Sequence, residues 1–141
     1  MIKAFLRWVF LRRPYWHLDG YMNRWWIRKH RPGGWWSARI HQILRSDLDR
    51  HQHDHPWPYI TIILAGGYWE ERPDWAMKWH GPGSILIRKA TDRHRLIVPD
   101  GATCWTLFIM GKWRQTWGFY TEAGKVPYTE YSSTFPAERP T

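Results

Sequence analysis

Short apolar segments separated by turn residues limit the fold of this chain more than any other feature. Eight such segments, rich in Ile, Trp and Thr, follow one another at intervals of roughly ten residues. They cover residues 38–45, 59–64, 67–71, 76–80, 84–88, 95–98, 103–110 and 116–120. Gly66-Gly67 and Asp100-Gly101 are typical of the turns between them. This spacing predicts an antiparallel sandwich or barrel, although the first segment would also suit a helix.

The remaining residues are expected to surround this barrel. A length of 141 residues suits one domain with a core of its own. We expect an N-terminal basic aromatic extension over residues 1–37 that packs on the barrel, the barrel itself over 38–124, and an extended C-terminal tail over 125–141. The single cysteine, Cys104, lies in an apolar segment and is expected to be buried and inert. A lone buried thiol fits a cytoplasmic protein.

The N-terminal region carries most of the positive charge. The net charge is +9, and residues 1–50 hold 11 Lys and Arg against 3 acidic residues. Tryptophans at 25, 26, 35 and 36 flank the basic residues 28–31, a pattern that suits stacking on a nucleotide or nucleic acid. A core edge or a homodimer interface would use the same tryptophans. Residues 1–13 predict a short amphipathic helix that caps the domain or lies on a membrane surface, and no apolar stretch is long enough to span a membrane.

Histidines at alternate positions form the most specific chemical motif. His51, His53 and His55 precede the segment 59–64, and His94 follows a later apolar segment. Alternate residues of a strand project from one face, so two or three of these imidazoles can point into the same cavity. Histidine is the commonest metal ligand, and this spacing therefore predicts a metal site. Asp54 would point to the opposite face and is expected to support the site or its turn.

The same residues resemble the motifs of the cupin superfamily. The segments HDHPW, GGYWEE, HRL and WTLF are similar to those of small, uncharacterised cupin-like proteins of bacteriophage and bacterial genomes. His53 and His55 match the His-x-His pair of the first cupin motif, and Gly66 or Gly67 matches its glycine. Tyr59 and Ile60 occupy the place of its glutamate. The second motif is matched by residues 83–87 and His94, without its usual proline and glycine. The resemblance implies an all-β, cupin-type double-stranded β-helix, a jelly-roll barrel.

The resemblance also implies a set of metal ligands. His53, His55 and His94 would bind a divalent metal ion such as Fe, Ni, Mn, Zn or Cu and leave open positions for a ligand. His51 could add a fourth ligand, or could form the pair with His53 in a shifted register, although the glycines favour His53 with His55. Without the glutamate, this set is similar to the three-histidine cupins, which include Fe(II)-dependent thiol dioxygenases. The expected function is a metal-dependent oxygenase or isomerase.

A small polar or anionic substrate would lie above these histidines. Arg88 is expected to bind an anionic group if it points inward with Leu86, and Tyr59 and Trp105 are further expected substrate contacts. Glu70 and Glu71 could reach the rim of the site as an acid or base, although a surface hairpin carrying two glutamates is the commoner arrangement. The alternatives are a non-catalytic cupin that binds a nucleotide or sugar, and a nucleic-acid-binding module that uses the N-terminal region. The sequence has no phosphate-binding glycine loop and no nucleophile elbow.

Overall fold

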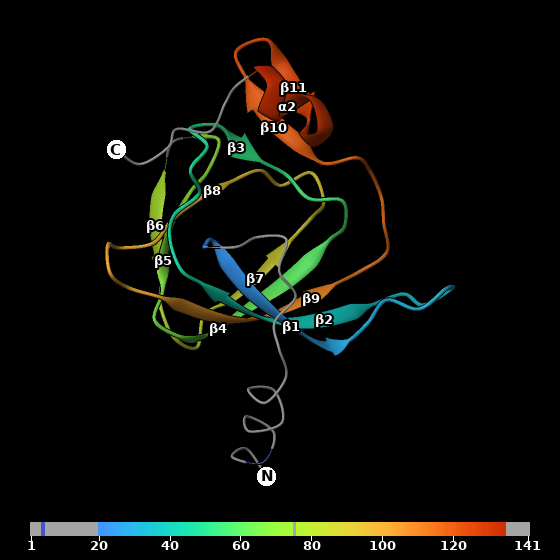
Figure 1. Ribbon diagram of the computed structural model, residues 1–141, viewed down its shortest axis with the longest axis vertical. Helices are drawn as coiled ribbons and strands as arrows, with labels where there is room; N and C mark the ends of the chain where they lie inside the picture. Colours follow the sequence, from blue (N-terminus) through green and yellow to red (C-terminus); the bar gives the residue numbers. More distant parts are fainter. Residues whose placement is uncertain (1–3, 5–19, 75, 135–141) are drawn as a thin grey trace.

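The computed structural model describes residues 4, 20–74 and 76–134, whose regular secondary structure is mainly antiparallel strands (Figure 1). The helix expected within residues 1–13 lies outside the described residues, apart from residue 4. A five-stranded sheet has the order β1 (Met22–Arg28), β2 (Ser37–Ile43), β9 (Cys104–Met110), β4 (Tyr59–Ala65), β7 (Ile85–Arg88). The all-β prediction is confirmed, and the first predicted segment is a strand and not a helix.

Two three-stranded sheets complete the described fold. One has the order β6 (Met77–His80), β5 (Tyr68–Glu71), β8 (Arg95–Ile97), and the other β11 (Gly124–Pro127), β10 (Gly118–Thr121), β3 (Gln52–His53). In Figure 1 the five-stranded sheet lies below, the β6-β5-β8 sheet to the left, and the β11-β10-β3 sheet above, with the helix α2 (Tyr128–Thr134) beyond it. The three sheets thus surround a common interior.

Two regions differ from the sequence expectation. The segment expected to be part of an extension forms β1, which pairs with β2 along its length, so the sheet begins at Met22. Trp25 of this strand stacks on Trp105 at 5.6 Å between ring centroids, which stabilises the outer face of the sheet. The tail expected to be extended from residue 125 is extended only in β11 and becomes helical at Tyr128.

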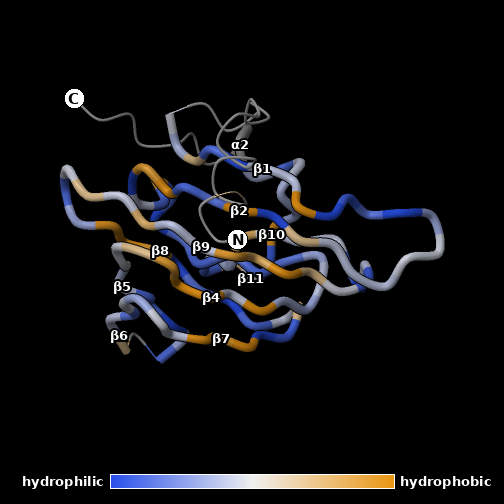
Figure 2. The backbone as a smooth tube through the Cα atoms, turned by 90° about the horizontal axis from the view of Figure 1, so that it is seen from below, coloured by the Kyte–Doolittle hydropathy of each residue, from blue (hydrophilic) through white to orange (hydrophobic). Residues whose placement is uncertain are grey.

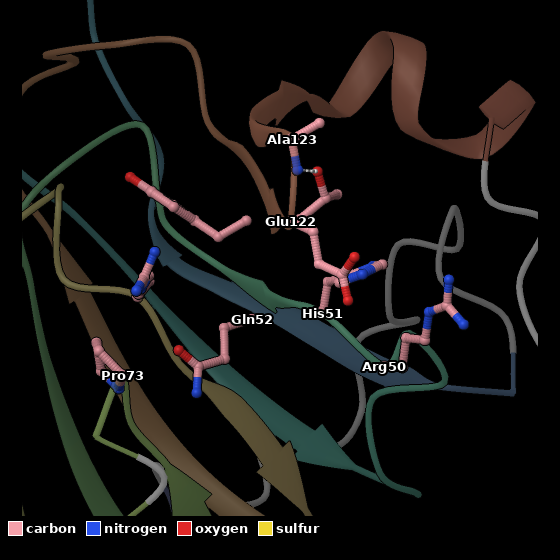
Figure 3. Close-up of a pocket in the computed structure, with 9 residues that line it drawn as sticks. Arg50, His51, Gln52, Pro73, Glu122 and Ala123 are labelled. Carbon is pink, nitrogen blue, oxygen red and sulfur yellow. Dashed lines mark hydrogen bonds between the residues drawn. The ribbon is translucent and has the colours of Figure 1, made fainter.

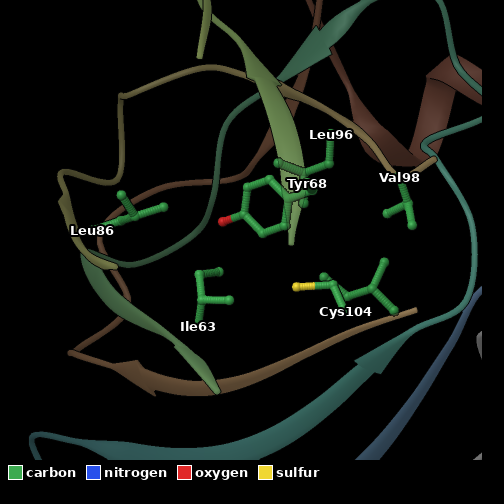
Figure 4. Close-up of a cluster of buried hydrophobic side chains, with 7 residues drawn as sticks. Ile63, Tyr68, Leu86, Leu96, Val98 and Cys104 are labelled. Carbon is green, nitrogen blue, oxygen red and sulfur yellow. The ribbon is translucent and has the colours of Figure 1, made fainter. Parts of the chain in front are cut away.

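Alternation along the strands divides the interior from the outer faces. On β9 the residues Cys104, Thr106, Phe108 and Met110 are buried, whereas the residues between them are only partly so. An apolar cluster fills one end of the interior (Figure 4), and it consists of Ile43, Ile63, Tyr68, Leu86, Leu96, Val98 and Cys104. Figure 2 shows the apolar stretches that β4, β7 and β9 contribute to the large sheet. As predicted, Cys104 is buried, and burial raises its pKa to about 12.

Two glycines shape the turn from β4 to β5. Gly66 has φ +72°, and a Cβ there would lie 2.0 Å from the carbonyl oxygen of Thr103. A Cβ on Gly67 would lie 2.5 Å from the Trp79 ring. Both positions of the expected glycine motif therefore exclude any larger residue, because the backbone passes too close to its neighbours.

Asp54 fastens the histidine segment to the C-terminal hairpin. Its side chain is 0% exposed and accepts hydrogen bonds from the Gly118 backbone N–H at 2.9 Å and the Tyr120 hydroxyl at 2.9 Å. Lys125 Nζ lies 2.7 Å from the same carboxylate. This fits the expectation that Asp54 supports the turn, since the carboxylate holds β10 and β11 against β3 and fixes the histidine segment in place.

No helix within residues 20–74 and 76–134 combines the length and the apolar character that crossing a membrane requires.

Candidate metal centre

Three histidines meet in the interior, on the side where β3 faces the strand β8. His53 and His94 lie opposite each other in an antiparallel bridge, with each backbone N–H donating to the other's carbonyl at 2.9 Å. The backbone N–H of His55 donates to the carbonyl of Ala90 at 3.1 Å. Each of the three side chains then offers one ring nitrogen, and these nitrogens all lie within 4.8 Å of one another. Backbone pairing therefore brings together residues that are far apart in sequence.

The spacing of the ring nitrogens fits a divalent metal ion. His55 Nε2 and His94 Nε2 are 3.0 Å apart. Two imidazole nitrogens that bind one ion at about 2.1 Å with a right angle between them are separated by about 3.0 Å. The three rings meet edge to face, with centroids 5.0 to 5.1 Å apart. The group thus has the donor type and the separation that a transition-metal site requires.

Burial keeps the imidazoles of His53 and His55 neutral. It lowers the pKa of His53 to about 4, against the opposing effect of Asp47, and it lowers the pKa of His55 well below its usual value, helped by His53 and His94. A metal ligand must present a lone pair, so a neutral imidazole is the form that binds.

Glu70 orients His94 from behind. Its carboxylate accepts a hydrogen bond from His94 Nδ1 at 2.8 Å, which makes Nδ1 the protonated nitrogen and leaves Nε2 to face the other two rings. Asp47 lies behind His53, with Oδ2 3.8 Å from Nδ1, which is an ion-pair distance and too long for a hydrogen bond. Carboxylates behind metal-binding histidines fix the ring orientation and raise the basicity of the ligand nitrogen.

Glu70 is the centre of a buried ionic network. Its side chain is 1% exposed, so the expectation that it lies in a surface hairpin is wrong. Arg88 forms a fork on both carboxylate oxygens, with Nη2 at 2.6 Å and Nε at 3.2 Å, and His80 Nε2 lies at 3.0 Å. Burial favours the neutral acid, but the hydrogen bonds from His94 and Arg88 outweigh it and hold the pKa of Glu70 well below its usual value.

The three expected substrate contacts do not lie together in the structure. Arg88 points inward, as the alternation predicted, but its guanidinium group is paired with Glu70. Tyr59 lies beside the histidines, with its ring centroid 4.5 Å from that of His55. Trp105 lies on the outer face of the large sheet against Trp25, so the structure does not bring it to the histidines.

His51 also lies apart from the group. Its Nδ1 is 2.9 Å from the hydroxyl of Tyr131, and among the described residues it is not one of the three whose nitrogens converge. It lines a separate pocket of about 810 Å³ on the outside of β3, together with Arg50, Gln52, Pro73 and Glu122 (Figure 3). The register that pairs His53 with His55 is therefore the one that the backbone adopts.

Comparisons with known proteins identify the architecture. No protein-family model and no curated protein sequence matches this chain. The solved structure of the polyketide cyclase RemF from Streptomyces resistomycificus matches with a TM-score of 0.62 and 17% identity, over 89% of this chain and 84% of that one. An RmlC-like cupin protein from Ralstonia eutropha matches with a TM-score of 0.58 and 13% identity, over 92% and 85%. The chain has the cupin fold. At such identities the likeness establishes the fold alone.

A further solved structure with this fold is the DMSP lyase DddQ from Ruegeria pomeroyi. It matches with a TM-score of 0.59 and 16% identity, over 78% of this chain and 61% of that one. The present chain departs from the expected first motif because Tyr59 stands in the place of the glutamate. Glu70 nevertheless supplies a carboxylate near the site. This carboxylate lies behind His94 and contacts its ring, and it does not itself face the three converging nitrogens. Sequence reasoning considered Glu70 only as a possible acid or base at the rim and missed its contact with His94, and it gave no role to Asp47 or His80.

Proposed function

We propose that this cupin binds one divalent transition-metal ion through His53, His55 and His94, and that it acts on a small polar or anionic ligand in the barrel. The observation that supports the proposal most directly is the convergence of the three ring nitrogens within 4.8 Å. The carboxylate of Glu70, which accepts a hydrogen bond from His94, supports it further, because metal-binding histidines usually have such a partner.

The donor set suits catalysis better than a closed structural site. Three imidazoles leave at least one coordination position for water or a ligand oxygen. A divalent ion held there would act as a Lewis acid toward a bound oxygen atom. The chain's own contribution is to orient the His94 imidazole through Glu70 and to surround the ligand with buried side chains. We propose an oxygenase or isomerase reaction. Two proteins with the same fold, a polyketide cyclase and a DMSP lyase, are enzymes.

Metal content measured by elemental mass spectrometry tests this proposal. We expect about one equivalent of Fe, Ni, Mn, Zn or Cu per chain after loading and desalting of untagged protein. The variant His53→Ala/His55→Ala is expected to lose it, because a single imidazole cannot hold the ion against buffer. The matched control is His51→Ala, which removes the neighbouring histidine of the same sequence pattern and is expected to leave the stoichiometry unchanged.

The outcomes separate the candidate ligand sets. A loss of metal in His51→Ala alone would show that His51 is a ligand and would favour the shifted register, in which His51 pairs with His53. If no variant and no loading condition gave stoichiometric metal, the metal proposal would be wrong. Turnover is then tested by O₂ consumption and product analysis with loaded protein and small oxygen-rich ligands. A loaded protein that binds such ligands without converting any of them would favour the non-catalytic alternative.

A further inference from the structure

A second group of polar side chains lies inside the barrel next to the histidines. It is arranged around Phe108, which occupies the inner face of β9. The ring of His41 stacks on Phe108 with a centroid distance of 4.7 Å, the ring of Tyr59 lies 4.8 Å away, and that of His55 lies 6.2 Å away. The guanidinium carbon of Arg39 lies 5.8 Å from the same centroid. Phe108 thus forms an apolar floor between Arg39 and His41 on one side and His55 on the other.

Three buried polar atoms around this floor lack a hydrogen-bond partner. They are His41 Nε2, Thr106 Oγ1 and Tyr59 Oη, in side chains that are 6%, 1% and 4% exposed. His41 and Thr106 are direct neighbours across β2 and β9, and both point inward. Buried polar groups in folded proteins are nearly always satisfied by protein, water or a ligand. Three such atoms around one floor indicate that something else completes their hydrogen bonds.

The positive charge around these atoms indicates that the missing hydrogen-bond partner is negatively charged. Arg39 points into the interior beside Phe108, and Arg24 lies opposite His41 in the register of β1 and β2. After burial, the charges of Arg39 and Arg24 are the main causes that lower the pKa of His41, so both guanidinium groups act on this part of the interior. Hydroxyl and imidazole N–H groups donate to anionic oxygens, and guanidinium groups favour them. Arg88 is paired with Glu70.

We propose that the barrel interior above Phe108 binds a small organic anion whose carboxylate lies against Arg39, His41 and Thr106 and whose other end reaches the His53, His55 and His94 group. The contact with the three histidines rests on the proposed metal site. The carboxylate site at Arg39, His41 and Thr106 does not. The compact floor, with His41 and His55 both in contact with Phe108, limits the ligand to a few carbon atoms between its two ends.

Isothermal titration calorimetry with malonate tests the anion site without the metal. The protein is first treated with a chelator and desalted, so that carboxylate binding to a metal ion cannot contribute. We expect saturable binding of malonate and at least about tenfold weaker binding of the neutral malonamide, since a hydrogen bond to a charged group accounts for about this factor. Inorganic phosphate in the same titration distinguishes a phosphate ligand from a carboxylate ligand.

Thr106→Val is the decisive variant because it removes one donor and keeps the shape. We expect malonate to bind about tenfold more weakly, while the melting temperature in the absence of anion is unchanged or higher, because the lost hydroxyl has no partner. Thr103→Val, at an exposed position just before β9, is the matched control and should change neither. Arg39→Gln is expected to weaken malonate binding further if the variant folds, which near-UV circular dichroism reports.

The results separate this inference from the proposed metal site. If the native protein takes up no metal under any loading condition but still binds malonate, this result supports the anion site and counts against the proposed metal site. Full metal uptake without binding of malonate or phosphate would overturn the anion site. Equal binding of malonate by the native protein and Thr106→Val would also overturn it, and so would a lower melting temperature in that variant, because the hydroxyl would then have a partner already.

Discussion

The buried carboxylate of Glu70 gives the sharpest prediction. In Glu70→Gln the side chain keeps its shape but loses its charge, while Arg88 keeps its positive charge in the interior. The amide can accept at only one of its two heavy atoms, so at least one of the donors His80, His94 and Arg88 is left without an acceptor. Removal of one partner from a buried ion pair costs about 3 kcal/mol at the lower end of the observed range. For a chain of this size, that cost corresponds to a fall of roughly 10 °C in the melting temperature.

Thermal unfolding at pH 7 in the presence of a chelator, followed by circular dichroism, measures this effect. Glu71→Gln is the matched control, because Glu71 accepts from Gln52 at 3.2 Å and lies 3.8 Å from Arg95, whereas Arg88 reaches Glu70 at 2.6 Å. We expect a change of less than about 1 kcal/mol in the control. Metal affinity in Glu70→Gln should also fall by about 10-fold to 100-fold, since His94 loses the group that orients it.

The pH dependence of the same pair of proteins provides a second test. The pKa of Glu70 is lower in the folded than in the unfolded state, where it is about 4.3. Its stabilisation is therefore fully present above that value and is lost as the pH falls further through the folded-state pKa. The difference between the native protein and Glu70→Gln should shrink below about pH 4. Equal stability at neutral pH, or a difference that does not change on acidification, would refute the ionic network as described.

Four other outcomes are expected. Asp54→Asn should loosen the hairpin of β10 and β11, with faster amide hydrogen exchange there, because Lys125 loses its carboxylate partner. Between about pH 6.5 and pH 4, metal-free protein should lose up to about 1.4 kcal/mol per pH unit in urea unfolding, since the lowered pKa of His53 means that the unfolded chain binds the extra proton. Cys104 should not react with a disulfide reagent at pH 8 until the protein unfolds, because its pKa is raised to about 12. Gly66→Ala should lower the yield of folded protein, since its Cβ would overlap a carbonyl oxygen at 2.0 Å.

The sequence predicted the strands of the barrel because their alternation and turn residues are local signals. On β9, Cys104 and Phe108 alternate with residues that face outward, and this pattern is visible without any partner strand. The strand β1 was missed because its tryptophans and arginines resemble a surface extension, whereas pairing with β2 makes it part of the sheet. The composition of a polar segment alone does not show that it pairs with the next strand.

The histidines of the site were foreseen, but the groups that support them were not. Glu70 looked like part of a charged surface hairpin because Glu71 follows it. A usable signal was present, since Tyr68 and Glu70 share one face of β5 and a tyrosine of that segment belongs in the core. His41 gave no comparable signal. Its meaning depends on Phe108 and Thr106, which lie on a strand more than sixty residues later in the chain.

The place of β9 in the large sheet has a consequence for biosynthesis. The strand lies between β2 and β4, yet residues 104–110 leave the ribosome long after both of its neighbours. Until then β2 and β4 have no partner on that side, and their core residues Ile43 and Ile63 stay exposed on the nascent chain. Exposed apolar surface and unpaired strand edges are what chaperones bind and what aggregates form from. The barrel therefore closes late, and expression at low temperature or with added chaperones should raise the yield of soluble protein.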